Sequence, residues 1–220
     1  MIEEILPRRV VAVDTFEDAR GAVLFPEEEA LMARAVDNRR RAFTTARVCA
    51  RAALARLGHP PAPILRGERG APIWPAGVVG SITHCHGYRA AAVAHATDVL
   101  TIGVDAEPND VLPEGVLDIV ADPDERAWIA DLTATRPIVC WDRLLFSAKE
   151  SVYKAWFPLT GRWLGFEEAS LTADPDTRTF TARLHTSAVL DDGRHITGFT
   201  GRWLARDGLL TTAISVPADA

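Results

Sequence analysis

The chain has 220 residues, of which 48% are hydrophobic, enough to bury one substantial core or two small ones. Its N-terminus lacks a long apolar core, and no apolar stretch approaches the ~18 residues of a membrane span, so we expect neither export nor membrane insertion. The three cysteines are far apart in the sequence, which fits a reducing cytoplasm. Residues 1–101 hold 13 Arg against 11 Asp and Glu, and residues 102–220 hold 11 Lys and Arg against 19 Asp and Glu, a balance that argues against a general nucleic-acid binder.

The first half of the chain is predicted to contain two helices followed by strands. Pro26 and three glutamates open a helix over 26–35, and Gly58 closes a longer one over 39–57. A loop rich in Pro and Gly follows. After it, strands are predicted over 78–85, 88–96 and 101–107, the first two joined through His86-Gly87.

The second half repeats this order. A short helix near 124–132 precedes a long helix over 138–157, and strands are predicted over 169–172, 179–190, 198–204 and 209–216. Each half thus places a long helix before a hairpin with an x-Gly turn. No residue-level repeat accompanies this order, so it suggests internal duplication only at the level of topology.

Arginines lie along one flank of the first long helix, beside its apolar stripe, and they are candidates for an anion site. Arg39 or Arg40 could hold a phosphate together with Arg47 and with His84 of the following strand, supported by the Ser81 and Thr83 hydroxyls. A solvated helix flank and a purely structural histidine are the plainer alternatives. Zinc bound by the histidines at 84, 86 and 95 is a third alternative, but no fourth ligand is suitably spaced.

The strand over 101–107 carries two carboxylates on one face. Alternation buries Ile102, Val104 and Ala106 and leaves Asp105 and Glu107 pointing to one spot on the opposite face. Neighbouring carboxylates repel each other unless a cation lies between them, and oxygen ligands with open positions suit magnesium. A solvated strand face is the alternative for such a short motif.

Both lysines of the chain, Lys149 and Lys154, lie on the long helix over 138–157, which has apolar residues on two opposite sides. Glu150 lies at the edge of the second side, with Lys154 one turn further on. An exposed i,i+4 pair would be the ordinary interpretation. A carboxylate beside an apolar patch needs a partner, however, and a metal shared with Asp105 and Glu107 would supply one.

Together these motifs resemble the paired signatures of 4′-phosphopantetheinyl transferases. The resemblance covers about residues 25–216 and is strongest with the bacterial enterobactin-synthase type, which is two-lobed and monomeric. Its motifs are Ile102-Gly103-Val104-Asp105-x-Glu107, Trp141-Asp142-x-x-x-Phe146-Ser147-x-Lys149-Glu150-Ser151-x-Tyr153-Lys154, the arginines from Arg39 to Arg51, Gly70-x-Pro72-x-Trp74-Pro75, Gly80-Ser81-x-Thr83-His84-Cys85 and Trp163-Leu164-Gly165-Phe166.

The resemblance implies an α+β fold of two similar α/β lobes related by pseudo-two-fold symmetry, with the active site in the cleft between them. We expect an N-terminal lobe over 1–101 and a C-terminal lobe over 102–220. It also implies a cytoplasmic, monomeric enzyme that moves 4′-phosphopantetheine from coenzyme A to a serine of an apo acyl, peptidyl or aryl carrier protein and releases adenosine 3′,5′-bisphosphate. Fatty-acid, polyketide, nonribosomal-peptide and siderophore carriers are not distinguished.

Residue roles follow from matching the motifs. Asp105, Glu107 and Glu150 would hold Mg²⁺, with Mn²⁺ as a substitute, and Arg39, Arg47 and His84 would hold the 3′-phosphate of coenzyme A. Arg66 or Arg69 would reach the nucleotide, and Lys149 would guide the phosphate or the pantetheine arm. Glu150, or a metal-bound water, is the candidate base for the serine proton, and Lys154 the candidate for neutralising or protonating the departing phosphate. The carrier is expected to lie near the segment 111–131.

Two other classes of protein are possible. A different Mg²⁺-dependent phosphoryl-transfer enzyme, such as a nuclease, could use the same carboxylates, but the negative charge balance and the Arg-His cluster argue against it. A noncatalytic nucleotide-binding protein would have little use for three convergent carboxylates.

Overall fold

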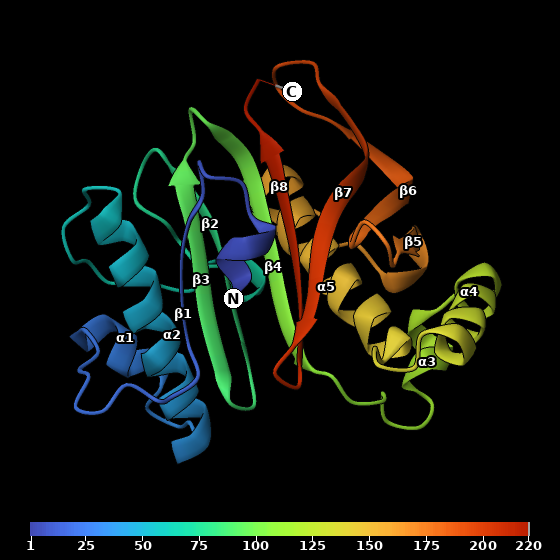
Figure 1. The fold of residues 1–220 in the computed structure, drawn as a ribbon. Helices are drawn as coiled ribbons and strands as arrows, with labels where there is room; N and C mark the ends of the chain where they lie inside the picture. Colours follow the sequence, from blue (N-terminus) through green and yellow to red (C-terminus); the bar gives the residue numbers. More distant parts are fainter. Residues whose placement is uncertain (220) are drawn as a thin grey trace.

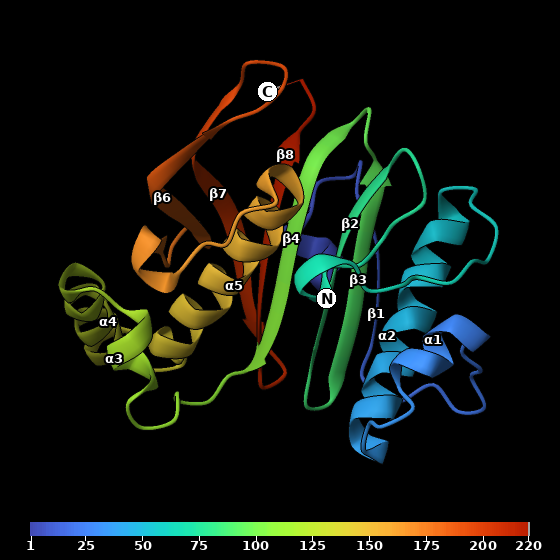
Figure 2. The same ribbon diagram turned by 180° about the vertical axis from the view of Figure 1, so that it is seen from behind.

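Two antiparallel sheets, each covered by a twenty-residue helix, make up residues 1–219, the part of the chain that the computed structural model describes (Figure 1). The first sheet has the strand order β1-β3-β2 and the second the order β4-β8-β7-β6-β5. Figure 2 shows α2 beside the first sheet and α5 across the strands of the second. The α+β class predicted from the sequence is confirmed.

The N-terminal lobe is built around a strand that is buried on both faces. It contains β1 (Val11–Thr15), β2 (Val78–Cys85), β3 (Tyr88–His95), α1 (Pro26–Leu31) and α2 (Asp37–Arg56). On β3, Ala91 and Val93 pack against α2, whereas Ala90 and Ala92 pack toward the second sheet. Small side chains allow both layers to approach the strand closely.

The C-terminal lobe is larger, and its core lies between α5 and the five-stranded sheet. Its strands are β4 (Val99–Pro108), β5 (Ala169–Asp174), β6 (Thr179–Val189), β7 (His195–Arg206) and β8 (Leu209–Pro217). Its helices are α3 (Val116–Val120), α4 (Pro123–Thr135) and α5 (Trp141–Thr160). Trp141 and Trp156 of α5 are fully buried in this core, and Trp141 meets Trp203 of β7 edge-to-face.

The two lobes meet where β2 lies beside β4. The backbone amides of Val104 and Ala106 on β4 donate to the hydroxyls of Ser81 and Thr83 on β2, at 3.1 and 3.0 Å. On the other side of this junction, the short 3-10 helix Ile2–Ile5 buries Ile2 completely in the same core. Since β4 begins at Val99, the lobe boundary expected between residues 101 and 102 falls inside a strand of the second sheet.

The predicted elements agree well with the structure where the apolar pattern is strong. The hairpin of β2 and β3 turns at Gly87, whose φ is 73°. The prediction differs most from the structure at β1 and α3, which were not predicted, and at α1, which ends at Leu31 instead of residue 35. The bounds of α4, α5 and β7 differ by up to three residues. None of the helices within residues 1–219 combines the length and apolar character that a membrane span requires.

Candidate active site

Asp105 and Glu107 lie on the same face of β4, as alternation along the strand predicts. Ile102, Val104 and Ala106 point the other way, into the core shared with the first sheet. The carboxylate of Asp105 is buried, and its Oδ1 accepts a hydrogen bond of 3.3 Å from the Thr83 hydroxyl. Asp105 Oδ2 is buried and has no hydrogen-bond partner within residues 1–219.

Helix α5 approaches β4 closely because a glycine lies at the point of contact. A Cβ built on Gly103 would be 2.0 Å from the carbonyl oxygen of Ser151 and 2.8 Å from the amide nitrogen of Ala155. Hydroxyl groups then fix the helix on β8: the side chains of Ser147 and Ser151 are 2.9 and 2.7 Å from Thr212 Oγ1. These contacts fix the position of α5 on the sheet and therefore where Glu150 and Lys154 project.

Two cations stand beside the β4 carboxylates. Lys154 of α5 donates to Asp105 Oδ1 at 2.7 Å and to the carbonyl of Val104 at 3.1 Å. Arg143, at the N-terminal end of the same helix, donates to Glu107 Oε2 at 3.2 Å. Burial, and next the charge of Asp105, nevertheless raise the pKa of Glu107 to about 7, against the lowering effect of Arg143. The negative charge on β4 is therefore only partly compensated.

Glu150 contributes a third carboxylate from α5. It is half-buried and forms no ion pair within residues 1–219, and burial raises the pKa of its carboxyl, with Lys154 opposing and Asp105 reinforcing the shift. In this conformation, no three Asp, Glu, His or Cys side chains of the described chain converge closely enough to enclose an ion. Their chemistry nevertheless fits a hard divalent cation, because an unpartnered buried carboxylate oxygen and two carboxyls with raised pKa values gain from one.

A second group of side chains forms a basic cluster around Phe43 of α2. The guanidinium groups of Arg47 and Arg66 lie 4.2 and 5.2 Å from the centre of its ring. Burial, and next the charge of Arg39, lower the pKa of Arg66, and neither Arg39 nor Arg66 forms an ion pair within residues 1–219. Like charges held together in this way favour an anion between them.

Arg47 is buried, and only one edge of its guanidinium is hydrogen-bonded in residues 1–219. Its Nε donates to the carbonyl of Ile64 at 2.8 Å and lies 3.8 Å from the buried carboxylate of Glu28. Its two terminal nitrogens make no hydrogen bond in the part of the chain that the structure describes, and burial lowers its pKa to about 10. This geometry leaves one edge of the guanidinium for a ligand.

His84 connects the basic cluster to the carboxylates. Loss of solvation, followed by the charges of Lys154, Arg89 and Arg66, lowers the pKa of the His84 imidazole, while Asp105 has a smaller opposite effect. A phosphate close to these cations would favour the protonated imidazole. Arg39, Arg47, Arg66 and His84 thus belong to the N-terminal lobe, whereas Lys154 lies on α5 of the C-terminal lobe.

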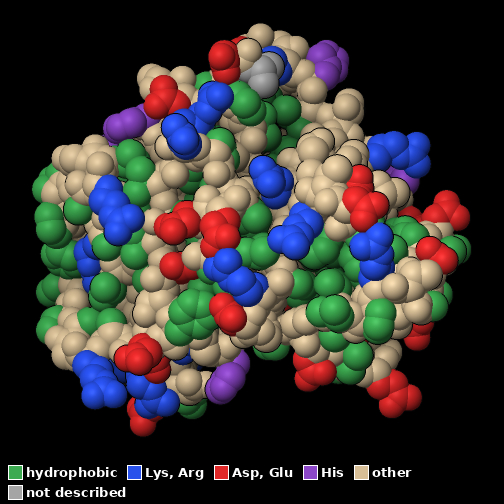
Figure 3. Space-filling model, in the orientation of Figure 1, with side chains coloured by type: hydrophobic (Ala, Val, Ile, Leu, Met, Phe, Trp, Pro, Cys, Tyr) green, Lys and Arg blue, Asp and Glu red, His purple; other side chains and the backbone are tan. Residues whose placement is uncertain are grey.

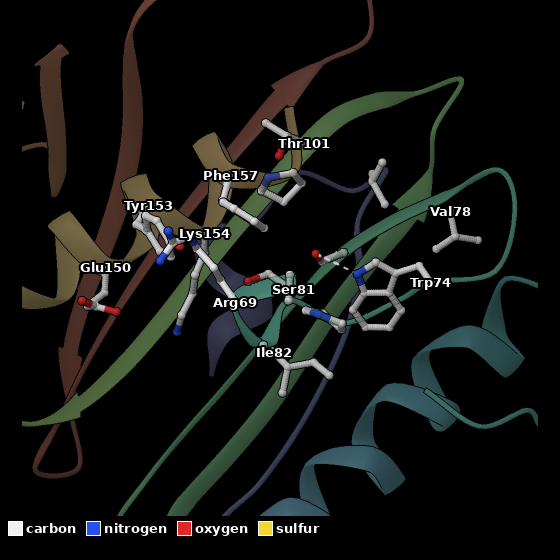
Figure 4. A pocket seen from close by; sticks show the side chains of 16 residues that line it. Arg69, Trp74, Val78, Ser81, Ile82, Thr101, Glu150, Tyr153, Lys154 and Phe157 are labelled. Atoms are coloured by element: carbon white, nitrogen blue, oxygen red, sulfur yellow. Dashed lines mark hydrogen bonds between the residues drawn. The ribbon is translucent and has the colours of Figure 1, made fainter. Parts of the chain in front are cut away.

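A pocket of about 550 Å³ opens between the lobes next to Lys154 (Figure 4). Figure 4 shows Glu150, Tyr153, Lys154 and Phe157 of α5 on one side, and Trp74, Val78 and Ile82 of the N-terminal lobe on the other.

Arg69, on the loop that precedes β2, reaches across the cleft to the C-terminal lobe. Its guanidinium lies 5.1 Å from the ring of Trp163, which packs in turn on Tyr153 at 5.0 Å. Arg69 is therefore separate from the cluster around Phe43, to which Arg66 belongs.

Lys149 does not reach this site, contrary to the sequence-based expectation. It is 4% exposed, and its ammonium group donates to Glu125 Oε2 at 2.8 Å and to the carbonyls of Val120 and Phe166 at 2.7 and 2.9 Å. All three donors are thus used inside the C-terminal lobe, where they tie α5 to α3 and α4. The buried ion pair has a structural role, because removing either partner would leave a buried charge uncompensated.

The hydroxyls of Ser81 and Thr83 also serve the fold instead of the basic cluster. Both are buried and accept hydrogen bonds from β4 amides. Their side chains face β4, whereas His84 faces away, so Thr83 contributes by holding Asp105.

Arg143 was missed by the sequence analysis. It lies seven residues before Glu150, and at 100° per residue this spacing puts both side chains on nearly the same face of α5. That spacing was the available signal.

Known proteins share both halves of this architecture. A family model described as the 4′-phosphopantetheinyl transferase N-terminal domain matches residues 27–94, and one described as the 4′-phosphopantetheinyl transferase superfamily matches residues 101–203. The 4′-phosphopantetheinyl transferase Svp of Streptomyces mobaraensis is 58% identical over 100% of this chain and 91% of its own length. The 4′-phosphopantetheinyl transferase Npt of Nocardia iowensis is 53% identical over 98% of this chain and 99% of its own. Enterobactin synthase component D of Salmonella typhi is more distant, with 33% identity over 49% of this chain and 44% of its own length.

Proposed function

Because the chain belongs to the 4′-phosphopantetheinyl transferase superfamily, we propose roles for its residues in the transfer of 4′-phosphopantetheine from coenzyme A to a serine of an apo carrier protein. The observation that carries the assignment is that β4 presents Asp105 and Glu107 on one face and that α5, which packs on β4, carries Glu150 and pairs Lys154 with Asp105 at 2.7 Å. Charge of both signs in one cleft suits a reaction in which a pyrophosphate is bound, neutralised and cleaved.

The basic cluster is the proposed site for the 3′-phosphate of coenzyme A. Arg47 and Arg66 present unpaired guanidinium nitrogens around Phe43, the charge of Arg39 acts on Arg66, and His84 adds an imidazole from β2. Planar guanidinium groups suit the paired oxygens of a phosphate. We assign the nucleotide contact to Arg66, since Arg69 is stacked on Trp163.

The carboxylates of Asp105, Glu107 and Glu150 would hold a divalent cation, Mg²⁺ by preference and Mn²⁺ as a substitute. When bound, such an ion supplies neutralisation of the pyrophosphate charge. Lys154 is the second source of positive charge, and it is already within hydrogen-bonding distance of Asp105.

In the proposed transfer, the serine oxygen of the carrier attacks the β-phosphorus of coenzyme A. A bond forms between this oxygen and the phosphorus, and the bond from the β-phosphorus to the bridging oxygen breaks, which releases adenosine 3′,5′-bisphosphate. Glu150 takes the serine proton, because burial makes its carboxylate more basic than usual. Lys154 neutralises or protonates the departing phosphate.

The carrier is proposed to approach over the chain that leads into α3. Val111 and Ile119 are 65% and 73% exposed there, and Figure 3 shows hydrophobic side chains gathered over α3 with acidic ones around them. Because carriers are usually acidic around the modified serine, contact with this surface would be mainly apolar. Hydrogen exchange of residues 111–131 should slow when an apo carrier is added, and unchanged exchange would place the carrier elsewhere.

The experiment that tests the proposal is intact-mass spectrometry of purified apo carrier proteins incubated with coenzyme A, Mg²⁺ and the enzyme. Each carrier that is a substrate should gain one phosphopantetheine on its serine, and a chelator should stop the gain until Mg²⁺ or Mn²⁺ is restored. Glu150→Gln should lower the rate at least about 100-fold while the protein still folds, whereas Glu17→Gln, an exposed control in the N-terminal lobe, should not. Near-normal turnover by Glu150→Gln would refute the base and metal assignment.

The same preparation tests the proposed monomeric state. Size-exclusion chromatography with light scattering should give a mass close to the 23.9 kDa of one chain. A larger mass that does not depend on concentration would contradict it.

A further inference from the structure

Arg143 makes contacts in three directions with three different nitrogens. Its Nη1 donates to Glu107 Oε2 at 3.2 Å, its Nε to the carbonyl of Asp110 at 2.9 Å and its Nη2 to the carbonyl of Val111 at 2.7 Å. The side chain is 15% exposed. One guanidinium thus joins a carboxylate of the active site to the backbone that leaves β4.

The backbone that Arg143 holds is attached at several points to the N-terminal end of α5. The amide of Leu112 donates to Asp142 Oδ2 at 2.9 Å, and the side chain of Asn109 bonds both the amide of Cys140 and the carbonyl of Ile138 at 2.9 Å. In this segment, residues 109–112, Arg143 supplies the contact to a charged group of the active site. The segment then leads directly to α3.

We propose that Arg143 is a positioning residue that makes the conformation of residues 109–112 depend on Glu107. The hydrogen bond to the carboxylate is charge-assisted and therefore stronger than the two to neutral carbonyls. When the Glu107 side chain turns away from Arg143, the guanidinium loses the partner that fixes its orientation, and its hydrogen bonds to the carbonyls of Asp110 and Val111 weaken. A change in the orientation of Glu107 thereby changes the conformation of the chain that leads to the proposed carrier-binding surface.

This inference rests on the proposed function in two respects: Glu107 is assigned as a metal ligand, and the chain before α3 is assigned as the surface that binds the carrier. It adds a link between them that neither assignment contains. Only arginine fits the geometry, because its planar fork spreads donors over three nitrogens, whereas a lysine ammonium is a single point.

A double-mutant cycle read by hydrogen exchange tests the link in the full chain without coenzyme A or metal. Glu107→Gln should raise exchange in peptides covering residues 109–112 at least about threefold, the effect of an ordinary coupling between contacting residues. Arg143→Gln should raise it at least as much, and the double variant no further. As a control, Arg126→Gln should leave this segment unchanged, because Arg126 holds the carbonyls of Asp118 and Ala121 instead.

Kinetics supply the second readout. Arg143→Lys, which can still pair with Glu107, should raise KM for the carrier protein at least about threefold and leave KM for coenzyme A unchanged. An effect of Glu107→Gln that persists in the Arg143→Gln background would overturn the proposal, as would equal changes in both KM values. Should the purified enzyme modify no carrier, the proposed function would fail while the exchange cycle would still decide the link.

Discussion

Gly103→Ala should be far more damaging than its single added methyl group suggests. The new Cβ would lie 2.0 Å from the carbonyl oxygen of Ser151, which belongs to the helix backbone and cannot rotate away. Restoring an ordinary contact of 3.4 Å would require α5 and β4 to separate by about 1.4 Å, the difference between these two distances. Overpacking of this kind costs about 1–3 kcal/mol of stability.

The displacement matters for activity because Glu150 and Lys154 are carried by the helix that must move. A misplacement of about 1 Å can lower a rate about 100-fold. We therefore expect the folded Gly103→Ala variant to lose about two orders of magnitude in kcat for the carrier protein, measured by mass spectrometry after circular dichroism has established the folded fraction.

Gly201→Ala is the matched control. Its Cβ would lie 2.2 Å from the ring of Phe180 and 2.7 Å from the carbonyl of Ala213, inside the C-terminal lobe and away from the contact between α5 and β4. It should lower the melting temperature but leave kcat per folded molecule nearly unchanged. If Gly103→Ala keeps a normal kcat, or if both variants lose activity equally, the reasoning about α5 is refuted.

Three further predictions concern charge. The pKa of Glu107 is raised from 4.5 to about 7, so between these pH values the folded metal-free protein keeps a proton that the unfolded chain releases. The free energy of unfolding should therefore fall as the pH rises from 4.5 to about 7. In thermal melts with a chelator, Glu107→Gln should flatten this slope, and an unchanged slope would contradict the assignment. Lys154→Arg should lower the transfer rate about 100-fold with an altered pH–rate profile, and a matching rate and profile would rule out proton donation by Lys154. Arg66→Met should reduce the preference for coenzyme A over its 3′-dephospho form, whereas an undiminished preference in competition assays would place the 3′-phosphate elsewhere.

The placement of the candidate carboxylates could be predicted because short-range geometry determines it. Alternation along β4 puts Asp105 and Glu107 on one face whatever the rest of the fold does. The position of Glu150 on α5 likewise follows from helix periodicity and from the two apolar sides of that helix.

The error at Lys149 has a physical explanation in the same periodicity. At 100° per residue, residues five apart differ by 140° around the helix axis, so Lys149 and Lys154 cannot face one site. Nothing near Lys149 in the sequence identifies Glu125, on a different helix, as its partner. Tertiary contacts of this kind between distant segments are the part that local patterns do not contain.

The missed elements are those with weak local signals. The strand β1 has five residues, with only one of them buried, so its apolar pattern is shorter than most strands show. Helix α3 also has five residues and is capped by Gly115 in the left-handed conformation without a side-chain cap. Packing, more than local propensity, stabilises elements of this length.

The hydroxyl contacts under α5 also restrict how the enzyme could open and close. Ser147 and Ser151 are one turn apart, and both bond the single hydroxyl of Thr212, so sliding the helix by a turn of about 5.4 Å would leave one serine at that hydroxyl and replace the other with Ala155 or Arg143, at the cost of one hydrogen bond. The paired contacts therefore favour one axial register of α5 on β8, in which Glu150 and Lys154 keep their height above the sheet. With α5 held in this register, we expect a change in the width of the cleft to come from rotation of the N-terminal lobe about the contact between β2 and β4.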